Sequence, residues 1–536
     1  NNDLFLRQSH EVANQKTGFS LSPDAAKSST QKWFPLNKGG EFRRWYGNNF
    51  HIVNFEDQGN AICDYIDNTP GVKVKSNGRV INRDRYFHEG LTWSTISSSE
   101  FSLRYSPQGS LFETKGAMIF FDTPESTKSV LGLLNTKITS YLLKATSPTL
   151  DFHEGPVGRL PLLFSDETIN STTKRTAERA VELSKSDWDT YERSWDFINL
   201  SLLHPDHHQP KLPDTYTALR AHLRDMTDEM QRLEEENNRL FIDAYGLQDE
   251  LTPDVPLNEI TLTCNPHYRY GGDKSEEELE SLMLTDMMKE MISYAIGCMM
   301  GRYSLAEPGL VYADSGNEGF DASRYGGFPA DDDGIVPITD REWFDDDATR
   351  RFEEFVKTAW PQENLRESLA FIAAALAKNG TSDPLAIIRN YLTRQFYKDH
   401  LKTYKKRPIY WLFSSGKLRA FECLVYLHRY NEGTLSRMRM EYVTPLQSRM
   451  AARIDQLTGD IEAASSTPDM KRKQKEKDKL VKQLDELRSF DEQLRHFADK
   501  RISLDLDDGV KVNYGKFGKL LAEVPAICGK KKVGQE

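Results

Sequence analysis

The sequence predicts an α+β domain followed by a mainly α-helical region with coiled-coil-like helices. Three observations lead to this fold class. Residues 1–164 are rich in aromatic and β-branched side chains, and Gly, Asn and Pro divide them into short runs, as in a domain of strands and turns. After Pro161, apolar residues recur at helical spacing instead. The 536 residues leave room for roughly two to four domains.

Short runs within residues 1–164 have the composition of strands, and turn signals separate them. The expected strands cover residues 50–55, 71–81, 90–96 and 117–121. Residues 126–144 carry apolar side chains at helical spacing, so we expect them to form one helix.

Two long helices are expected next, over residues 168–203 and 214–242, within a helical spacer that covers 165–250. The second helix has a heptad-like apolar ladder that is interrupted at Asn237 and is typical of a coiled coil. The ladder consists of Leu219, Leu223, Met226, Met230, Leu233 and Leu240.

Residues 251–435 are expected to form a helical domain with long loops. Ser275 and Glu278 have the spacing of a capping box that opens a helix. Further helices are expected over 363–378 and 384–397, and a long loop over 306–348.

The last segment, residues 436–536, is expected to form an αα-hairpin followed by a short tail. Apolar residues line two helical arms, and Thr467-Pro468-Asp469 fits the turn between them. Residues 510–512 have the composition of a short strand.

Composition excludes several classes of protein. No window approaches the ~18 consecutive apolar residues of a membrane span, and the N-terminus does not have the pattern of a signal peptide. The five cysteines are scattered, which indicates a reducing cytoplasm rather than a disulfide scaffold or a structural zinc site. Because the chain lacks an initiator Met and opens on a polar stretch, we expect a fragment of a longer protein.

The net charge of −11 is distributed unevenly. Residues 1–164 hold 18 Lys and Arg against 16 Asp and Glu, so the remainder, with 52 against 65, carries the negative charge. A nearly neutral front segment with local basic clusters can still bind phosphates, whereas the acidic remainder is not a general nucleic-acid surface.

The first candidate site is a cluster over residues 32–49 that combines cations, aromatic rings and Asn. Arg and Asn form paired hydrogen bonds with guanine and adenine edges, and Lys suits phosphates. The candidates for DNA binding in it are Lys32, Lys38, Arg43, Arg44, Trp45, Asn48 and Asn49. The alternative interpretation is a buried aromatic cluster with a few surface cations.

A second segment, residues 83–106, carries arginines and hydroxyl groups that suit phosphate and base-edge contacts, and an ordinary strand and turn are the alternative. Its candidates are Arg83, Arg85, Ser97, Ser98 and Arg104. A third segment, residues 131–162, gives no chemistry by itself, and its candidates Lys144, Thr146 and Ser147 rest on the family resemblance described below.

Other patterns resemble functional motifs only superficially. Asn265-Pro266-His267-Tyr268 differs from the Asn-Pro-Pro-Tyr motif of amino-methyltransferases at its third residue, and no Gly-rich S-adenosylmethionine loop precedes it. The acidic triplets at 331–333 and 345–347 lack the spacing of a calcium loop and are expected to be solvated. Residues 471–479 alternate cations with acids, which is typical of a solvated helix face. We therefore expect no catalytic, cofactor-binding or metal-binding residue in this chain.

The chain resembles the PglX family of BREX phage-defence adenine-specific DNA methyltransferases. The resemblance is carried by residues 32–49, by Glu89-Gly90-Leu91-Thr92-Trp93-Ser94 and by Arg104-Tyr105-Ser106-Pro107-Gln108-Gly109, which are similar to the target-recognition domain of these enzymes. It continues through residues 187–197, 238–247, 264–272, 405–416 and 504–510 in family order.

This resemblance implies that residues 1–164 form a DNA target-recognition domain and that the remainder is the helical C-terminal part of the enzyme. It implies as partners double-stranded DNA, an N-terminal methyltransferase domain and other BREX proteins, with no membrane partner. S-adenosylmethionine would be the cofactor of the parent enzyme, bound outside this chain, so this fragment alone is expected to be inactive. Two alternatives are a non-catalytic specificity or scaffold subunit and a nuclease.

Overall fold

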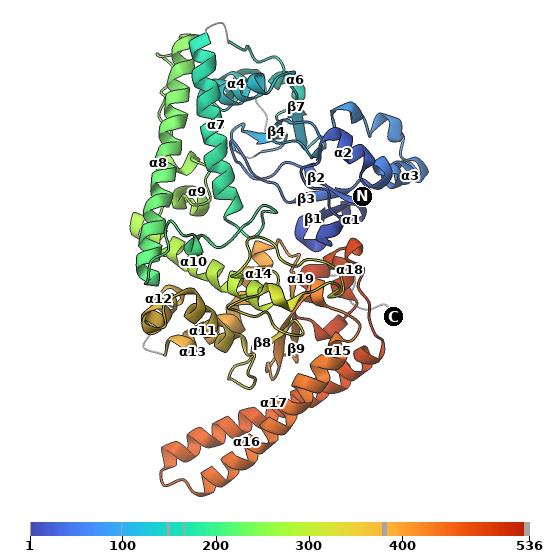
Figure 1. Ribbon diagram of the computed structural model, residues 1–536, viewed down its shortest axis with the longest axis vertical. Helices are drawn as coiled ribbons and strands as arrows, with labels where there is room; N and C mark the ends of the chain where they lie inside the picture. The colour runs from blue at the N-terminus through green and yellow to red at the C-terminus, as the bar shows by residue number, and fades with distance from the viewer. Residues whose placement is uncertain (1, 98, 147–150, 164–166, 378–382, 530–536) are drawn as a thin grey trace. The chain divides into compact units, whose positions relative to one another are not determined.

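The computed structural model describes residues 2–97, 99–146, 151–163, 167–377 and 383–529. These residues form two compact units (Figure 1). The first unit consists of Asn1–Ser9, Asn14–Ser201 and Tyr216–Met283, and the second of His10–Ala13, Leu202–Thr215 and Leu284–Glu536. The expected division at residue 164 therefore does not coincide with a unit boundary, because the helical spacer folds with the segment before it.

Two small sheets form the β part of the first unit. One contains, in order, β1 (Leu6–Gln8), β3 (His51–Asn54), β2 (Trp33–Asn37) and β6 (Leu111–Phe112). The other contains β5 (Leu103–Ser106), β4 (Gly90–Ser94) and β7 (Gly116–Ile119), and both of its pairings are antiparallel. Phe34, Val53, Phe55 and Phe87 belong to the apolar core of this unit.

Three of the four expected strands are found, at β3, β4 and β7, whereas the strand expected over residues 71–81 is wrong. That segment contains only a 3₁₀ turn, Ser76–Gly78. Ser76 donates its backbone N–H and its hydroxyl to the Asp67 carboxylate, at 2.7 and 2.6 Å. Asp67 lies near the end of helix α3 (Asn60–Asn68), so this contact turns the chain before a strand can pair.

The helix expected over residues 126–144 is two helices, α4 (Pro124–Leu134) and α5 (Lys137–Thr146). They are separated at Asn135, whose side-chain amide accepts from the N–H of Leu103 at 2.9 Å and donates to its carbonyl at 3.1 Å. The buried side-chain amide thus forms with β5 the pair of hydrogen bonds that the backbone of a neighbouring strand would form. This pairing lies at the residue where α4 ends.

Helices α7 (Glu167–Asp189) and α8 (Leu212–Tyr245) lie side by side (Figure 1). Helix α7 ends earlier than the expected residue 203. Helix α8 confirms the expected helix and extends it at both ends. The ladder is interrupted because buried Asn237 donates its side-chain amide to the carbonyl of Gly132 in α4, at 2.8 Å.

The second unit contains a three-stranded antiparallel sheet in the order β8 (Ile335–Pro337), β10 (Glu422–Tyr426) and β9 (Tyr410–Ser414). This sheet was not expected from the sequence. Helix α10 (Glu276–Met299) begins in the first unit and continues into the second, which resumes at Leu284. The other long helices of the second unit are α11 (Ala348–Ala359), α12 (Leu365–Leu376), α16 (Thr444–Glu462) and α17 (Thr467–Asp499). Its shorter helices are α13 (Pro384–Tyr391), α14 (Tyr397–Thr403), α15 (Thr434–Arg437), α18 (Val510–Gly515) and α19 (Val524–Cys528).

Three local features expected from the sequence can be compared with the structure: a capping box, a turn and a short strand. The capping box is confirmed, because Glu278 N–H donates to Ser275 Oγ at 3.2 Å and Ser275 N–H to the Glu278 carboxylate at 3.0 Å. Residues 467–469 open α17 rather than form the turn, since Ser466 caps that helix. The strand expected at 510–512 is wrong, because these residues begin α18.

Residues His10–Ala13 belong to the second unit although they lie close to the N-terminus. His428 shares a 3.0 Å hydrogen bond with the carbonyl of His10, and Val510 N–H donates to the Glu11 carboxylate at 3.0 Å. Within the described ranges, no helix is long and apolar enough to cross a membrane.

Candidate nucleic-acid interface

The aromatic residues of the 32–49 cluster are part of the core of the first unit. Trp33, Phe34, Trp45 and Tyr46 are all buried. For these rings, the alternative interpretation of a buried aromatic cluster is therefore the right one. Of the cations beside them, Arg43 and Arg44 are buried as well.

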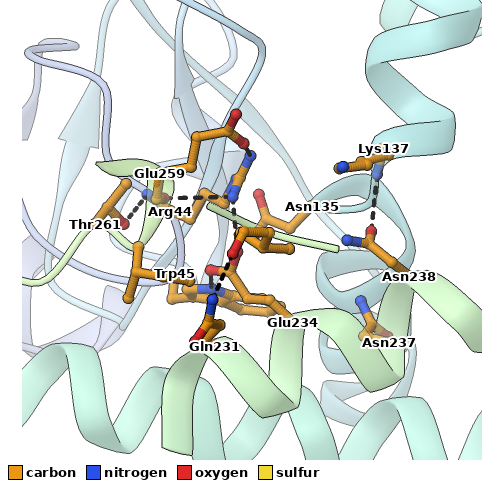
Figure 2. A network of polar contacts seen from close by, with 12 residues as sticks. Arg44, Trp45, Asn135, Lys137, Gln231, Glu234, Asn237, Asn238, Glu259 and Thr261 are labelled. Atoms are coloured by element: carbon orange, nitrogen blue, oxygen red, sulfur yellow. Dashed lines mark hydrogen bonds and ion pairs between the residues drawn. The ribbon is translucent and has the colours of Figure 1, made fainter. Parts of the chain in front are cut away.

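Arg44 and Trp45 are held by one carboxylate from helix α8 (Figure 2). Arg44 Nη1 and Trp45 Nε1 each donate to Glu234, both at 2.7 Å. The side chains of Arg44 and Glu234 are 5% and 3% exposed. Burial alone would lower the pKa of Arg44, but the carboxylates of Glu234 and Glu259 raise it, so the arginine stays charged inside the unit.

Arg43 is held in the same way by helix α7. Its guanidinium lies 3.4 Å from Asp187 and donates to Thr263 Oγ1 at 2.6 Å. Asp187 also accepts the backbone N–H groups of Thr263 and Cys264, at 2.7 and 2.8 Å. Arg43 and Arg44 thus fasten the loop after β2 to α7, to α8 and to the segment before helix α9 (Pro266–Tyr270).

Arg104 is buried without a carboxylate among its hydrogen-bond acceptors. It donates to the carbonyl of Arg43 at 3.4 Å and to Ser94 Oγ at 3.5 Å. Burial, together with the nearby charge of Arg43, lowers its pKa to about 10. Arg104 therefore supports the backbone of Arg43 from inside the unit and does not face solvent.

The remaining candidates of the first cluster are partly engaged. Buried Asn48 has a φ of 64° and donates its amide to the carbonyl of Glu41 at 2.9 Å. Lys38 pairs with Glu113 at 2.9 Å. Lys32 and Asn49 are half-buried, and the Lys32 ammonium lies 6.0 Å from the centre of the Trp33 ring.

The other candidates are more accessible. Arg83, Arg85, Lys144 and Thr146 are exposed and Ser97 is half-buried. Lys144 pairs with Glu100 at 2.8 Å. Ser98 and Ser147 lie outside the described residues, so the structure does not place them.

Arg83 and Arg85 belong to a longer basic surface, residues 71–86, which we call the basic segment. It holds five cations, Lys73, Lys75, Arg79, Arg83 and Arg85, against one acid, Asp84. All five are exposed, and so are Val74 and Ile81, at 50% and 51%. Lys73, Lys75 and Arg79 were not among the candidates, because their segment has the alternating pattern of a strand.

The Asn-Pro-His-Tyr sequence has a structural role. Asn265 caps helix α9 (Pro266–Tyr270) by accepting from the N–H of His267, and its amide donates to the carbonyls of Leu257 and Ile260, at 2.7 and 2.9 Å. Asn265 is fully buried. With its oxygen and nitrogen both committed to these hydrogen bonds, Asn265 does not fit the Asn of a methyl-transfer site.

The two acidic triplets, expected to be solvated, meet around one tyrosine in the second unit. Tyr442 Oη donates to Asp346 at 2.7 Å and lies 3.3 Å from Asp333. Burial raises the pKa of Asp333 to about 8 and that of Asp346 to about 6. Among the described residues, no group of three or more His, Cys, Asp or Glu is placed to hold a metal ion.

An α+β unit with an exposed basic segment, continuous with a helical unit, has the features of a candidate nucleic-acid-binding protein. The chain is 44% identical over 539 residues to the adenine-specific methyltransferase BrxX of Escherichia coli O9:H4 (strain HS), an alignment that covers 98% of this chain and 42% of that protein. It is 39% identical over 524 residues to the adenine-specific methyltransferase PglX of Lacticaseibacillus casei (strain Zhang), covering 96% and 41%.

The resemblance to the PglX family is therefore confirmed over nearly the whole chain. The chain spans about two fifths of the length of the curated relatives it matches. No protein-family model matches it.

Proposed function

We propose that this chain is the DNA-recognition and helical portion of a site-specific adenine (N6) DNA methyltransferase that marks host DNA in BREX anti-phage defence in the cytoplasm. The observation that carries the proposal is the 44% identity to an adenine-specific methyltransferase over 98% of the chain. In this proposal, S-adenosylmethionine is bound and the methyl group transferred by an N-terminal methyltransferase domain of the parent protein. The Asn-Pro-Pro-Tyr motif and the Gly-rich S-adenosylmethionine loop are both absent from this sequence, which supports that assignment.

The division of labour within the first unit follows from exposure. The basic segment offers five cations to the phosphates that dominate DNA affinity. Lys32, Asn49, Ser97, Lys144 and Thr146 are accessible enough to join it. Five candidates are buried and their polar groups have internal partners, so they would instead hold the loop after β2 (residues 38–50), which we call the recognition loop, in one conformation. They are Arg43, Arg44, Trp45, Asn48 and Arg104.

An exchange of the whole first unit tests this proposal. Residues 1–9, 14–201 and 216–283 of this sequence are replaced in the full-length parent by the matching residues of the L. casei relative, and adenine methylation in the cells is read by long-read sequencing. We expect the methylated motif to change to that of the donor. A parent that leaves no adenine mark would instead favour the non-catalytic specificity or scaffold subunit.

The basic segment is tested within the same assay by Arg83→Gln combined with Arg85→Gln. Loss of two phosphate contacts should weaken binding by about tenfold or more at moderate salt without unfolding the unit. Lys27→Gln combined with Lys115→Gln, which removes two exposed cations outside the segment, is the matched control. Equal methylation by both variants at limiting enzyme would exclude the basic segment from the interface.

A further inference from the structure

The first half of α17 is a second basic surface, in an otherwise acidic part of the chain. Residues 471–482 hold seven Lys and Arg against two acids, Glu476 and Asp478. Helices α16 and α17 form an antiparallel hairpin, and the basic residues begin next to its tip (Figure 1). From the sequence alone, residues 471–479 were expected to form an ordinary solvated helix face.

The structure separates the cations that are neutralised from those that are not. Arg472 and Lys473 pair with Asp469 at 2.7 and 2.8 Å, and Lys479 pairs with Asp340 at 2.5 Å. Among the described residues, Lys471, Lys475, Lys477 and Lys482 form no ion pair. Glu476 is already shared by Arg341 and Arg453, so it does not neutralise its neighbours.

Three of these lysines lie on one face of the helix, which they share with the exposed Asp478. Lys471, Lys475 and Lys482 are exposed, and their separations of four and seven residues correspond to about one and two turns. They are therefore spaced by ~6 and ~10 Å along the axis. Leu480, Leu484 and Leu487 are buried on the opposite side, so packing within the hairpin fixes the lysine face outward.

The chemistry of this face favours a polyanion over a protein partner. Protein interfaces are enriched in aromatic residues and Arg and depleted in Lys, whereas this face is Lys-rich and residues 470–482 contain no aromatic ring. Ammonium groups on flexible stems contact phosphates as point charges and do not read bases.

We infer that the lysine face of Lys471, Lys475 and Lys482 binds the phosphate backbone of double-stranded DNA without reading its sequence. This inference rests on the proposed function, which supplies DNA as the ligand. The face adds a sequence-independent contact to the sequence-dependent one proposed for the first unit.

The test is the salt dependence of duplex binding by the full chain, measured by fluorescence anisotropy on duplexes of unrelated sequence. Each phosphate contact contributes ~0.9 to the slope of log affinity against log salt concentration. The variant Lys471→Gln, Lys475→Gln, Lys482→Gln should reduce that slope by about 2–3 on every duplex. Replacing the same three lysines by Arg should preserve it.

A matched control removes three exposed lysines elsewhere in the second unit, Lys398, Lys417 and Lys519, by the same change to Gln. An unchanged slope in the first variant, or an equal decrease in the control, overturns the inference. So does competition by poly-glutamate as strong as by DNA at equal charge, because that result identifies an acidic protein as the ligand.

The two proposals fail in different ways. If the chain binds no duplex, the proposed function fails together with the inference. If exchange of the first unit changes the methylated motif while the glutamine variant keeps the full slope, the lysine face alone is excluded.

Discussion

Glu234 joins two residues of the recognition loop to helix α8, so its charge has a large effect on stability. We expect Glu234→Gln to lower the free energy of unfolding of the first unit by up to about 3–5 kcal/mol, because Arg44 loses its buried partner and keeps only the half-exposed Glu259 carboxylate at 3.3 Å. Urea denaturation measures this loss. Arg179→Ala, which breaks the half-exposed pair with Glu229, should cost only about 1 kcal/mol or less. Similar losses in the two variants would contradict the buried ion pair.

His400 carries a prediction about pH. Its Nε2 accepts the N–H groups of Ile409 and Tyr410, both at 3.2 Å, and these bonds require a neutral ring. Burial, and then the charge of Arg302, lowers its pKa from 6.5 to about 3. The ring is neutral in both states above about pH 7. Below pH 6.5 the unfolded chain binds a proton that the folded chain excludes. The free energy of unfolding therefore decreases as the pH is lowered.

Between pH 6.5 and 5 this effect amounts to ~2 kcal/mol. His400→Asn should remove that part of the pH dependence, measured by hydrogen exchange at Ile409 and Tyr410. His153→Asn, at an exposed ring, is the control. Glu422, whose pKa burial raises to about 7, acts with the opposite sign, so the difference between variant and wild type is the informative quantity. An identical pH dependence would show that the ring is protonated when folded.

At the scale of elements, α4 and α7 approach each other closely at Gly132. A Cβ built on Gly132 would lie 2.3 Å from Thr173 Cγ2 in α7. We therefore expect Gly132→Ala to destabilise the first unit by about 1–3 kcal/mol through overpacking.

Thr173→Ser removes the clashing methyl group and provides the test of that mechanism. The double variant Gly132→Ala, Thr173→Ser should recover most of the loss, as judged by thermal unfolding. If the two changes add without recovery, the close approach is not the cause.

Elements were predictable from the sequence where local pattern determines them. The apolar run at β4 and the ladder of α8 depend on burial along one segment, and both were found. The run at residues 71–81 alternates Val with Lys as an edge strand would, but a side-chain contact from Ser76 to Asp67 turns it instead. The sheet β8-β10-β9 joins segments that are far apart in the sequence, so periodicity gave no sign of it.

The candidate site was only partly predictable for a related reason. The cations of residues 32–49 were found, but not their partners, because Asp187 and Glu234 lie 144 and 190 residues away in the chain. One signal was present. Glu234 and Asn237 share a helix face with Met230 and Leu233, and polar residues on an apolar face need buried partners.

At the scale of the whole molecule, the first unit should fold only with its helices. Arg43, Arg44 and Trp45 bond to residues beyond 164, so a fragment of residues 1–164 would leave buried charges and an indole unpaired. We expect a fragment of residues 1–283 to resist limited proteolysis and the 1–164 fragment to be degraded. Equal resistance of the two fragments to proteolysis would show that residues 1–164 fold alone.

The second unit places a constraint on folding during synthesis. Residues His10–Ala13 pair with His428 and Val510, so they emerge from the ribosome roughly 500 residues before their last partner. Closing so long a loop is slow, and domains otherwise tend to fold in the order in which they are made. The second unit can therefore be completed only after translation has passed Val510, and until then this short segment must stay available while the first unit folds on both sides of it.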